Sequence, residues 1–216
     1  MTRGRFKSLV LVLAVLAAPA ALFPAEDGGA ITFRKVFKSS YPEYTEIKVT
    51  PNGSGTWDVR QLDEESAPQP FQISRPLVQR IYALAEQLHY FQGVELDVHR
   101  RIANLGQKTF QYQKGSETHE VTFNYTINSA ATELLAIFEG LARQATDLSD
   151  LQRVMRYDRL GVNKVLLRIE GDLNSRTLPE PESLVPTLDQ LGADEHFMDI
   201  ARQRARALAE RIRERH

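Results

Sequence analysis

The chain has 216 residues, a formal net charge of −1 and no cysteine. Without cysteine it can form no disulfide, iron–sulfur cluster or thiolate metal site, and it has no cysteine nucleophile. Attachment of a lipid anchor to a cysteine near the N-terminus is excluded for the same reason. The near-neutral charge gives no electrostatic argument for a nucleic-acid partner or an anionic membrane surface. The length is sufficient to bury one good hydrophobic core or two small ones.

The first twenty residues have the layout of a secretory signal peptide. Arg3, Arg5 and Lys7 precede an apolar run over residues 9–18, and the small residues Ala18 and Ala20 follow. A basic start, an apolar core and a small-residue site are the parts of a cleaved leader. We therefore expect a signal peptide over residues 1–20 and an exported chain, periplasmic or extracellular, that meets the membrane only through this leader.

The alternative for the leader is a retained anchor, with the apolar stretch continuing to Phe23. A membrane span needs about 20 apolar residues, and Pro19 interrupts a run that is already shorter than this. Cleavage after Ala20 would remove three basic residues and change the net charge of the chain from −1 to −4. Cleavage is the preferred interpretation.

Residues 31–60 show the alternation of apolar and polar residues that is typical of strands. Ile31, Phe33 and Phe37 predict a first strand, residues 44–50 a second, and residues 56–60 a third. Between the second and third strands, residues 51–55 supply the glycine and asparagine of a tight reversal. We expect a solvated loop over residues 63–70.

Residues 74–145 predict helix, hairpin and helix. Ser74 can cap a helix that has Pro76 in its first turn and apolar residues on one stripe as far as Phe91. A second hairpin follows at residues 110–127, and Asn128 or Ser129 caps the next helix. The order β-β-β-α-β-β-α predicts an α+β domain over residues 31–146, an antiparallel sheet with two helices on one face.

From residue 147 onward the apolar spacing is helical only. Gly161, Gly171 and the segment 178–181 separate stretches of helix, and a last helix is predicted from about Asp194 to Arg213. Each helix has an apolar stripe that needs a partner. We therefore expect residues 147–216 to form an all-helical C-terminal extension that folds on itself or on the sheet domain.

This layout resembles a domain of unknown function found in exported bacterial proteins. The resemblance is carried by Ile31-Thr32-Phe33, residues 44–50, the turn Asn52-Gly53-Ser54-Gly55-Thr56 and residues 84–91, and it covers about residues 31–145. Members of that family often have two cysteines between the first two strands, where this chain has Ser39-Ser40-Tyr41-Pro42. The resemblance implies no activity, because the family has no established function.

One cluster of residues could carry chemistry. On an extended segment, Glu95, Asp97 and His99 would place two carboxylates and an imidazole on one side, where they could hold a divalent cation or pair an acid with a base. Arg100 and Arg101 follow at once and can neutralise the carboxylates as surface ion pairs. Metal sites usually recruit ligands from separate segments. The surface interpretation is preferred, and we expect no metal and no cofactor.

Other motifs lack the spacing that catalysis needs. His119-Glu120 begins like a zinc-protease motif but has no second histidine four residues after His119. Ser54, between Gly53 and Gly55, lies in a predicted hairpin turn and lacks the spacing of a nucleophile elbow. Six arginines and two glutamates in residues 201–216 predict a solvated helix face.

These observations favour an exported, non-enzymatic protein that binds a protein or another envelope component. The alternative is a metal-dependent or other hydrolase whose site is assembled from dispersed residues such as Glu95, Asp97, His99 and His119. The two hypotheses differ in one geometric respect. Convergence of these side chains in one pocket would favour an enzyme, and dispersal would favour a binding module.

Overall fold

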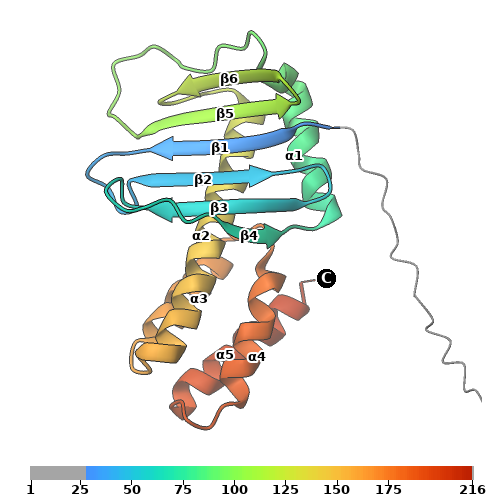
Figure 1. Cartoon of the computed structure of the whole chain (residues 1–216). Helices are drawn as coiled ribbons and strands as arrows, with labels where there is room; N and C mark the ends of the chain where they lie inside the picture. Colours follow the sequence, from blue (N-terminus) through green and yellow to red (C-terminus); the bar gives the residue numbers. More distant parts are fainter. Residues whose placement is uncertain (1–27, 216) are drawn as a thin grey trace, which may run out of the picture.

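The computed structural model of the chain describes residues 28–215. The predicted signal peptide, residues 1–20, lies outside the described residues. The described part consists of an antiparallel sheet, two helices against one face of it, and further helices beyond the β4 edge (Figure 1). This arrangement confirms the predicted α+β class and the predicted antiparallel sheet with helices.

Six strands form the sheet. They are β1 (Ala30–Val36), β2 (Tyr44–Val49), β3 (Ser54–Arg60), β4 (Gln69–Gln72), β5 (Gln107–Lys114) and β6 (Glu117–Phe123). Their spatial order is β4-β3-β2-β1-β5-β6, and every neighbouring pair is antiparallel. Gly53, in the β2–β3 turn, has a φ of +83°, a conformation that strains any residue with a side chain.

The two helices that cover the sheet are α1 (Arg75–Gln87) and α2 (Ser129–Tyr157), and the short 3-10 helix η1 (His89–Phe91) follows α1. Both caps are the predicted ones. The Ser74 side chain accepts a hydrogen bond from the Leu77 backbone N–H, and the Asn128 side chain accepts one from the Ala131 N–H. These bonds satisfy donors that the first turn of a helix leaves without a partner.

Aromatic side chains form the centre of the sheet core. Phe33 of β1 contacts Phe110 of β5 and Phe138 of α2, with ring centroids 5.8 and 5.5 Å apart. All three side chains are fully buried. Because Phe33 and Phe110 also stand opposite one another in the register of the sheet, this contact fixes where α2 crosses the strands.

The C-terminal helices enclose a second hydrophobic cluster. They are α3 (Val162–Asn174), η2 (Pro181–Leu184), α4 (Val185–Ala193) and α5 (Asp199–Arg213). Leu151 and Val154 of α2 belong to this cluster, whereas Phe138 and Leu141 of α2 belong to the sheet core. One helix is therefore shared by both cores. Within residues 28–215, no helix combines the length and the apolar character that a membrane crossing requires.

The segment between α3 and η2, residues 175–180, forms a strap across α2. A Cβ on Gly140 would lie 2.5 Å from the Thr177 carbonyl oxygen, so only glycine allows this approach. The Glu180 backbone N–H donates to Gln144 Oε1 over 3.1 Å, and the Glu180 carboxylate accepts from the Ser74 N–H at the start of α1. The strap thus ties the extension to both sheet-covering helices.

The structure corrects the expected strand pattern in two places. Gln69 and Pro70, expected in a solvated loop, belong to the edge strand β4, so the chain order is β-β-β-β-α-β-β-α. Four residues with a proline carry too little alternation to be recognised as a strand. At the other edge, β6 ends at Phe123. Tyr125 and Ile127, expected to alternate inward, are 44% and 71% exposed.

The helical part also differs from expectation. α2 continues through residues 146 and 147, so the expected domain boundary falls inside one helix. Gly171, expected to break a helix, lies within α3. It is exposed, and a Cβ at this position would meet no atom within 4 Å. The last helix begins at Asp199, not Asp194, and Ile200, expected on its buried stripe, is 56% exposed.

We expect Leu84→Asp to prevent folding and Glu86→Ala, on the same helix, to leave it intact. Leu84 is 1% exposed in the sheet core, and Glu86 is exposed. Burying an unpaired carboxylate costs several kcal/mol, comparable with a domain stability of ~5–15 kcal/mol. Thermal denaturation followed by circular dichroism distinguishes the two variants, and equal melting temperatures would contradict the prediction.

Candidate binding groove

A groove lies where α2 passes beneath the β4 edge of the sheet and enters the helical extension. It holds a cavity of about 470 Å³, within the range of about 300–1,000 Å³ that is common for small-ligand sites. Trp57 of β3 and Phe71 of β4 line one wall, and Leu141 and Leu148 of α2 line the other. We call this the junction groove.

Trp57 reaches the groove because of the sheet register. It stands opposite Ile47, which is fully buried on the helix-covered face, so Trp57 lies on that same face. β3 lies near the sheet edge, and only the four-residue β4 continues beyond it. The helices therefore leave this indole half-buried, with part of its surface facing the groove.

A smaller cavity of about 160 Å³ continues the groove along α2. Trp57 and Ser149 line both cavities, and Tyr41 and Asp150 line only the smaller one. The Tyr41 side chain is 91% exposed. Trp57 thus stands between two connected spaces, the larger toward Ser183 of η2 and the smaller toward the β1–β2 loop.

The polar groups of the larger cavity are all uncharged amides and hydroxyls. Gln144 Nε2 donates to Ser183 Oγ over 2.8 Å, and its Oε1 accepts from the strap, so both ends of the Gln144 amide are held in place. Ser149 and Gln152 are exposed and make no side-chain hydrogen bond to any of residues 28–215. Their donors and acceptors remain available to a bound molecule.

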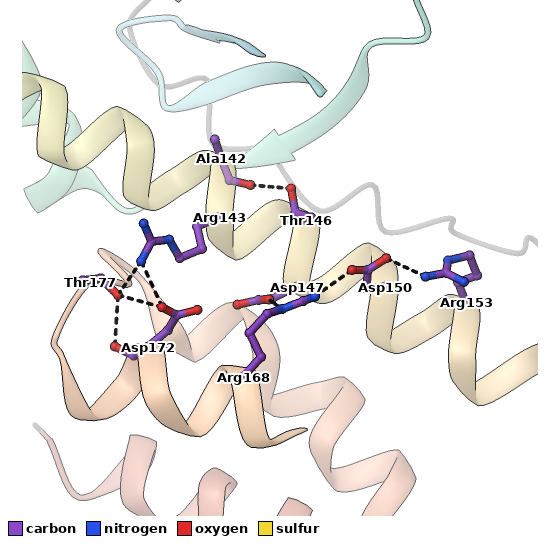
Figure 2. A network of polar contacts seen from close by, with 9 residues as sticks. All are labelled: Ala142, Arg143, Thr146, Asp147, Asp150, Arg153, Arg168, Asp172 and Thr177. Carbon is purple, nitrogen blue, oxygen red and sulfur yellow. Dashed lines mark hydrogen bonds and ion pairs between the residues drawn. The ribbon is translucent and has the colours of Figure 1, made fainter. Parts of the chain in front are cut away.

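On another side of α2, a charged network connects this helix to α3 (Figure 2). Arg168 of α3 donates through Nε to Asp147 Oδ1 over 2.6 Å and through Nη2 to Asp150 Oδ2 over 2.7 Å. Arg153 donates to the other oxygen of Asp150 over 2.8 Å. Arg168 therefore bridges two carboxylates one turn apart, and this bridge fixes α3 against the stretch of α2 that also lines the groove.

The second half of the network is a pair of carboxyl groups. Asp172 of α3 accepts hydrogen bonds from Arg143 over 3.0 Å and from Thr177 over 3.2 Å. Figure 2 shows its carboxyl group and that of Asp147 pointing toward one another. The Asp147 side chain is 1% exposed, and its Oδ2 atom is buried without a hydrogen-bond partner among the described residues.

The environment opposes ionisation of Asp147. Burial raises the pKa of this carboxyl from 3.8 to about 6; Arg168 acts in the opposite direction and Asp172 in the same direction as burial. When Asp147 is protonated, its Oδ2 hydroxyl can donate a hydrogen bond that the Asp172 carboxylate accepts. Burial also opposes ionisation of Asp150, but the hydrogen bonds from Arg153 and Arg168 outweigh it and lower the pKa of Asp150.

The structure brings Glu95, Asp97 and His99 near one another in the loop before β5. His99 Nε2 lies 3.5 Å from Glu95 Oε1, and His99 Nδ1 lies 3.8 Å from Asp97 Oδ2. The Glu95 and His99 side chains are 69% and 71% exposed. Across residues 28–215, no group of three or more His, Cys, Asp or Glu side chains is placed to hold a metal ion.

His119 does not join these residues. Asp97 contacts the Tyr125 N–H, beyond the end of β6, whereas His119 lies near the start of that strand. The four residues from His119 to Phe123 span roughly 13 Å of extended chain. His119 instead stacks on Tyr112, and its Nε2 lies 3.2 Å from Glu117. The four candidate side chains are therefore dispersed over two places.

Comparison with known proteins adds no relative. No protein-family model matches the chain, and no curated protein sequence matches it. The resemblance described above therefore depends on the quoted residues alone.

Neither the groove nor the carboxyl pair of Asp147 and Asp172 was predicted from the sequence. Asp147 lies four residues before Leu151 and seven before Val154, at helical spacing with two apolar residues that are buried. A charged residue on such a stripe is a signal that could have been noticed. The groove had no comparable signal, because its walls come from β3, β4, α2 and η2.

We expect zinc, manganese or calcium at saturating concentration to leave the melting temperature of the metal-stripped protein unchanged. Glu95, Asp97 and His99 come from five consecutive residues of a single loop, so ordering them around a cation would consume backbone entropy that no second segment offsets. A bound cation at a hundredfold excess over its Kd would stabilise the fold by about 2.7 kcal/mol. A metal-dependent rise that Asp97→Ala with His99→Ala abolishes would contradict this expectation.

The raised pKa of Asp147 predicts a pH-dependent stability. A carboxyl with a folded-state pKa above its unfolded value favours the folded state at low pH, and this contribution is lost as pH rises from about 4 to about 6. Asp147→Asn keeps an acceptor for Arg168 and adds a donor toward Asp172. We expect urea denaturation to show the variant gaining about 2 kcal/mol relative to the parent between pH 4 and pH 7.

Asp150→Asn is the matched control, since Asp150 shares Arg168 but has a lowered pKa. Its stability relative to the parent should change little between pH 4 and pH 7, because a lowered pKa changes the pH dependence of stability mainly below about pH 4. If Asp147→Asn differs from the parent by the same free energy at both pH values, Asp147 is ionised throughout and the prediction is wrong.

Proposed function

We propose that this protein is an exported, non-enzymatic binding protein whose junction groove receives a protein or another component of the cell envelope. The observation that carries the proposal is the make-up of the groove. An aromatic and aliphatic cavity of about 470 Å³ has uncharged polar groups at its rim, two of them on Ser149 and Gln152 without partners in the described part of the chain. Mainly apolar cavities with a few convergent polar groups are the usual form of ligand sites.

The proposal of export rests on the leader. The basic residues, apolar run and small-residue site of residues 1–20 support a periplasmic or extracellular location. The complete lack of cysteine makes the fold independent of the redox state of its compartment. Oxidation can alter the sulfur of a methionine. Within residues 28–215, Met155 is the one sulfur-containing residue associated with the two cores, and it lies at the margin of the second cluster.

Binding is favoured over hydrolysis by the placement of the acidic and histidine side chains. Glu95, Asp97 and His99 lie in one exposed loop, and His119 lies toward the other end of β6. None of these four residues lines the junction groove. General acid–base catalysis needs the acid and the base within hydrogen-bond reach of one substrate, and this arrangement does not bring them together at the junction groove.

The experiment fills the groove without disturbing either core. Ser149 is exposed on α2 and lines both cavities, so Ser149→Tyr would occupy the space beside Trp57. Ser129→Tyr is the control, an exposed serine on the same helix about 30 Å away. We expect the mature protein, beginning near Ala21, to cosediment saturably with envelope material of its own cell, Ser129→Tyr to do the same, and Ser149→Tyr to lose most of this binding.

Two results would contradict the proposal. Equal cosedimentation of the two tyrosine variants would show that the groove is not the binding surface. Recovery of the chain from cytoplasm with Met1 still present would show that it is not exported. Both variants should melt at the temperature of the parent, which separates loss of binding from loss of folding.

A further inference from the structure

The lining of the larger cavity of the junction groove contains no ionisable side chain. A quarter of the whole chain is charged, yet all fourteen residues that line the larger cavity are apolar or carry only an amide, hydroxyl or indole group. A charged ligand would lose its hydration there without gaining a partner of opposite charge. The lining therefore selects an uncharged molecule.

The polar groups of the groove are suited to hydroxyl groups. An amide and a hydroxyl can each both donate and accept, as a sugar hydroxyl can. Ser149 and Gln152 are free on one wall, and Ser183 Oγ is held in place by Gln144, which leaves the Ser183 hydroxyl hydrogen available. These groups line the same cavity as the half-buried Trp57 ring, and flat aromatic rings pack against the apolar C–H face of a pyranose.

An extended peptide is the main competing occupant, and the edge of the sheet argues against it. A peptide would add to β4 through backbone hydrogen bonds. β4 has only four residues, and Pro70 among them has no N–H to donate. Short, proline-containing edges are a usual device against strand addition. The groove therefore has side-chain groups to offer but an incomplete backbone ladder.

We propose that the junction groove binds a neutral oligosaccharide, with Trp57 between two sugar-binding subsites. This inference rests on the proposed binding function and names the class of ligand. The cavities of about 470 and 160 Å³ on either side of Trp57 provide room for more than one ring. Charged groups of Arg60, Glu64 and Asp150 line the smaller cavity, and sugar hydroxyls can hydrogen bond to such groups as well. Gln152, Ser149 and Ser183 hydrogen bond to hydroxyl groups of the sugar in the larger subsite.

Trp57 provides the readout, because it is the only tryptophan of the chain. The full-length mature protein is titrated with neutral tetrasaccharides of β-1,4-glucose, α-1,4-glucose and N-acetylglucosamine while tryptophan fluorescence is recorded. Tetragalacturonate serves as the anionic probe and a serine–alanine hexapeptide as the peptide probe. We expect a saturable change with at least one neutral tetrasaccharide, weaker binding of its monosaccharide, and no change with the anionic or peptide probe.

Two isosteric variants test the site. Gln152→Glu places a carboxylate at the rim of the groove, and Gln79→Glu makes the same change on an exposed position of α1 outside it. We expect Gln152→Glu to weaken saccharide binding by about tenfold or more, because the carboxylate must be desolvated by the ligand. Gln79→Glu should bind as the parent does. Calorimetric titration of Trp57→Phe should show reduced but measurable affinity.

The outcomes separate this inference from the proposed function. If no neutral saccharide changes the fluorescence or produces heat while Ser149-dependent envelope binding persists, the ligand is not a neutral sugar and only this inference is overturned. Binding of the hexapeptide or of tetragalacturonate in preference to the neutral sugars overturns it as well. If no neutral saccharide binds and the parent protein also shows no envelope binding that Ser149→Tyr weakens, both the proposed function and this inference are wrong.

Discussion

The structure depends on one helix being shared by two hydrophobic cores. Phe138 of α2 is buried against the sheet, and Leu151 of the same helix is buried among α3, α4 and α5. The two residues are thirteen positions apart, which corresponds to about 20 Å of helix. Over this length α2 passes from one core to the other, and neither core encloses all of its sides. The junction groove occupies one side of this stretch and the charged network another. Both features follow from the same transfer of a helix between partners.

The contact between α2 and α3 combines apolar packing with a strongly directional polar contact. Leu151 and Val154 pack with Leu166, and Arg168 bridges Asp147 and Asp150. Apolar packing tolerates small rotations, whereas two charge-assisted hydrogen bonds from one guanidinium require a defined position of both carboxylates. The network therefore sets the rotation of α3 about α2. The same arrangement leaves Asp147 Oδ2 buried without a hydrogen-bond partner among the described residues. Burial of this carboxyl group also raises its pKa.

The alternation of apolar residues was enough to predict most of the sheet, both helix caps and the α+β class. β4 was missed because its four residues include Pro70, whose place on an edge becomes apparent only when the neighbouring strand is known. The expected domain boundary at residue 147 was placed where the strand pattern stops, and it falls inside α2, whose apolar stripe changes direction near that point. That change marks a new packing partner and not a helix end. The groove could not be predicted, because Trp57, Phe71 and Ser183 lie far apart in sequence and meet only through the tertiary fold.

The strap of residues 175–180 limits how the length of the chain can vary in evolution. It passes over Gly140 too closely for any side chain there, and Glu180 bonds at once to Gln144 and to Ser74. An insertion or deletion within the strap would break one of these attachments and displace η2 from the groove. The loop between η1 and β5 places Leu96 in the sheet core, but its exposed residues 99–102 have no such double attachment to helices among the described contacts, and length changes there leave both cores untouched. Relatives of this chain should therefore differ in length in that loop and keep the strap at constant length.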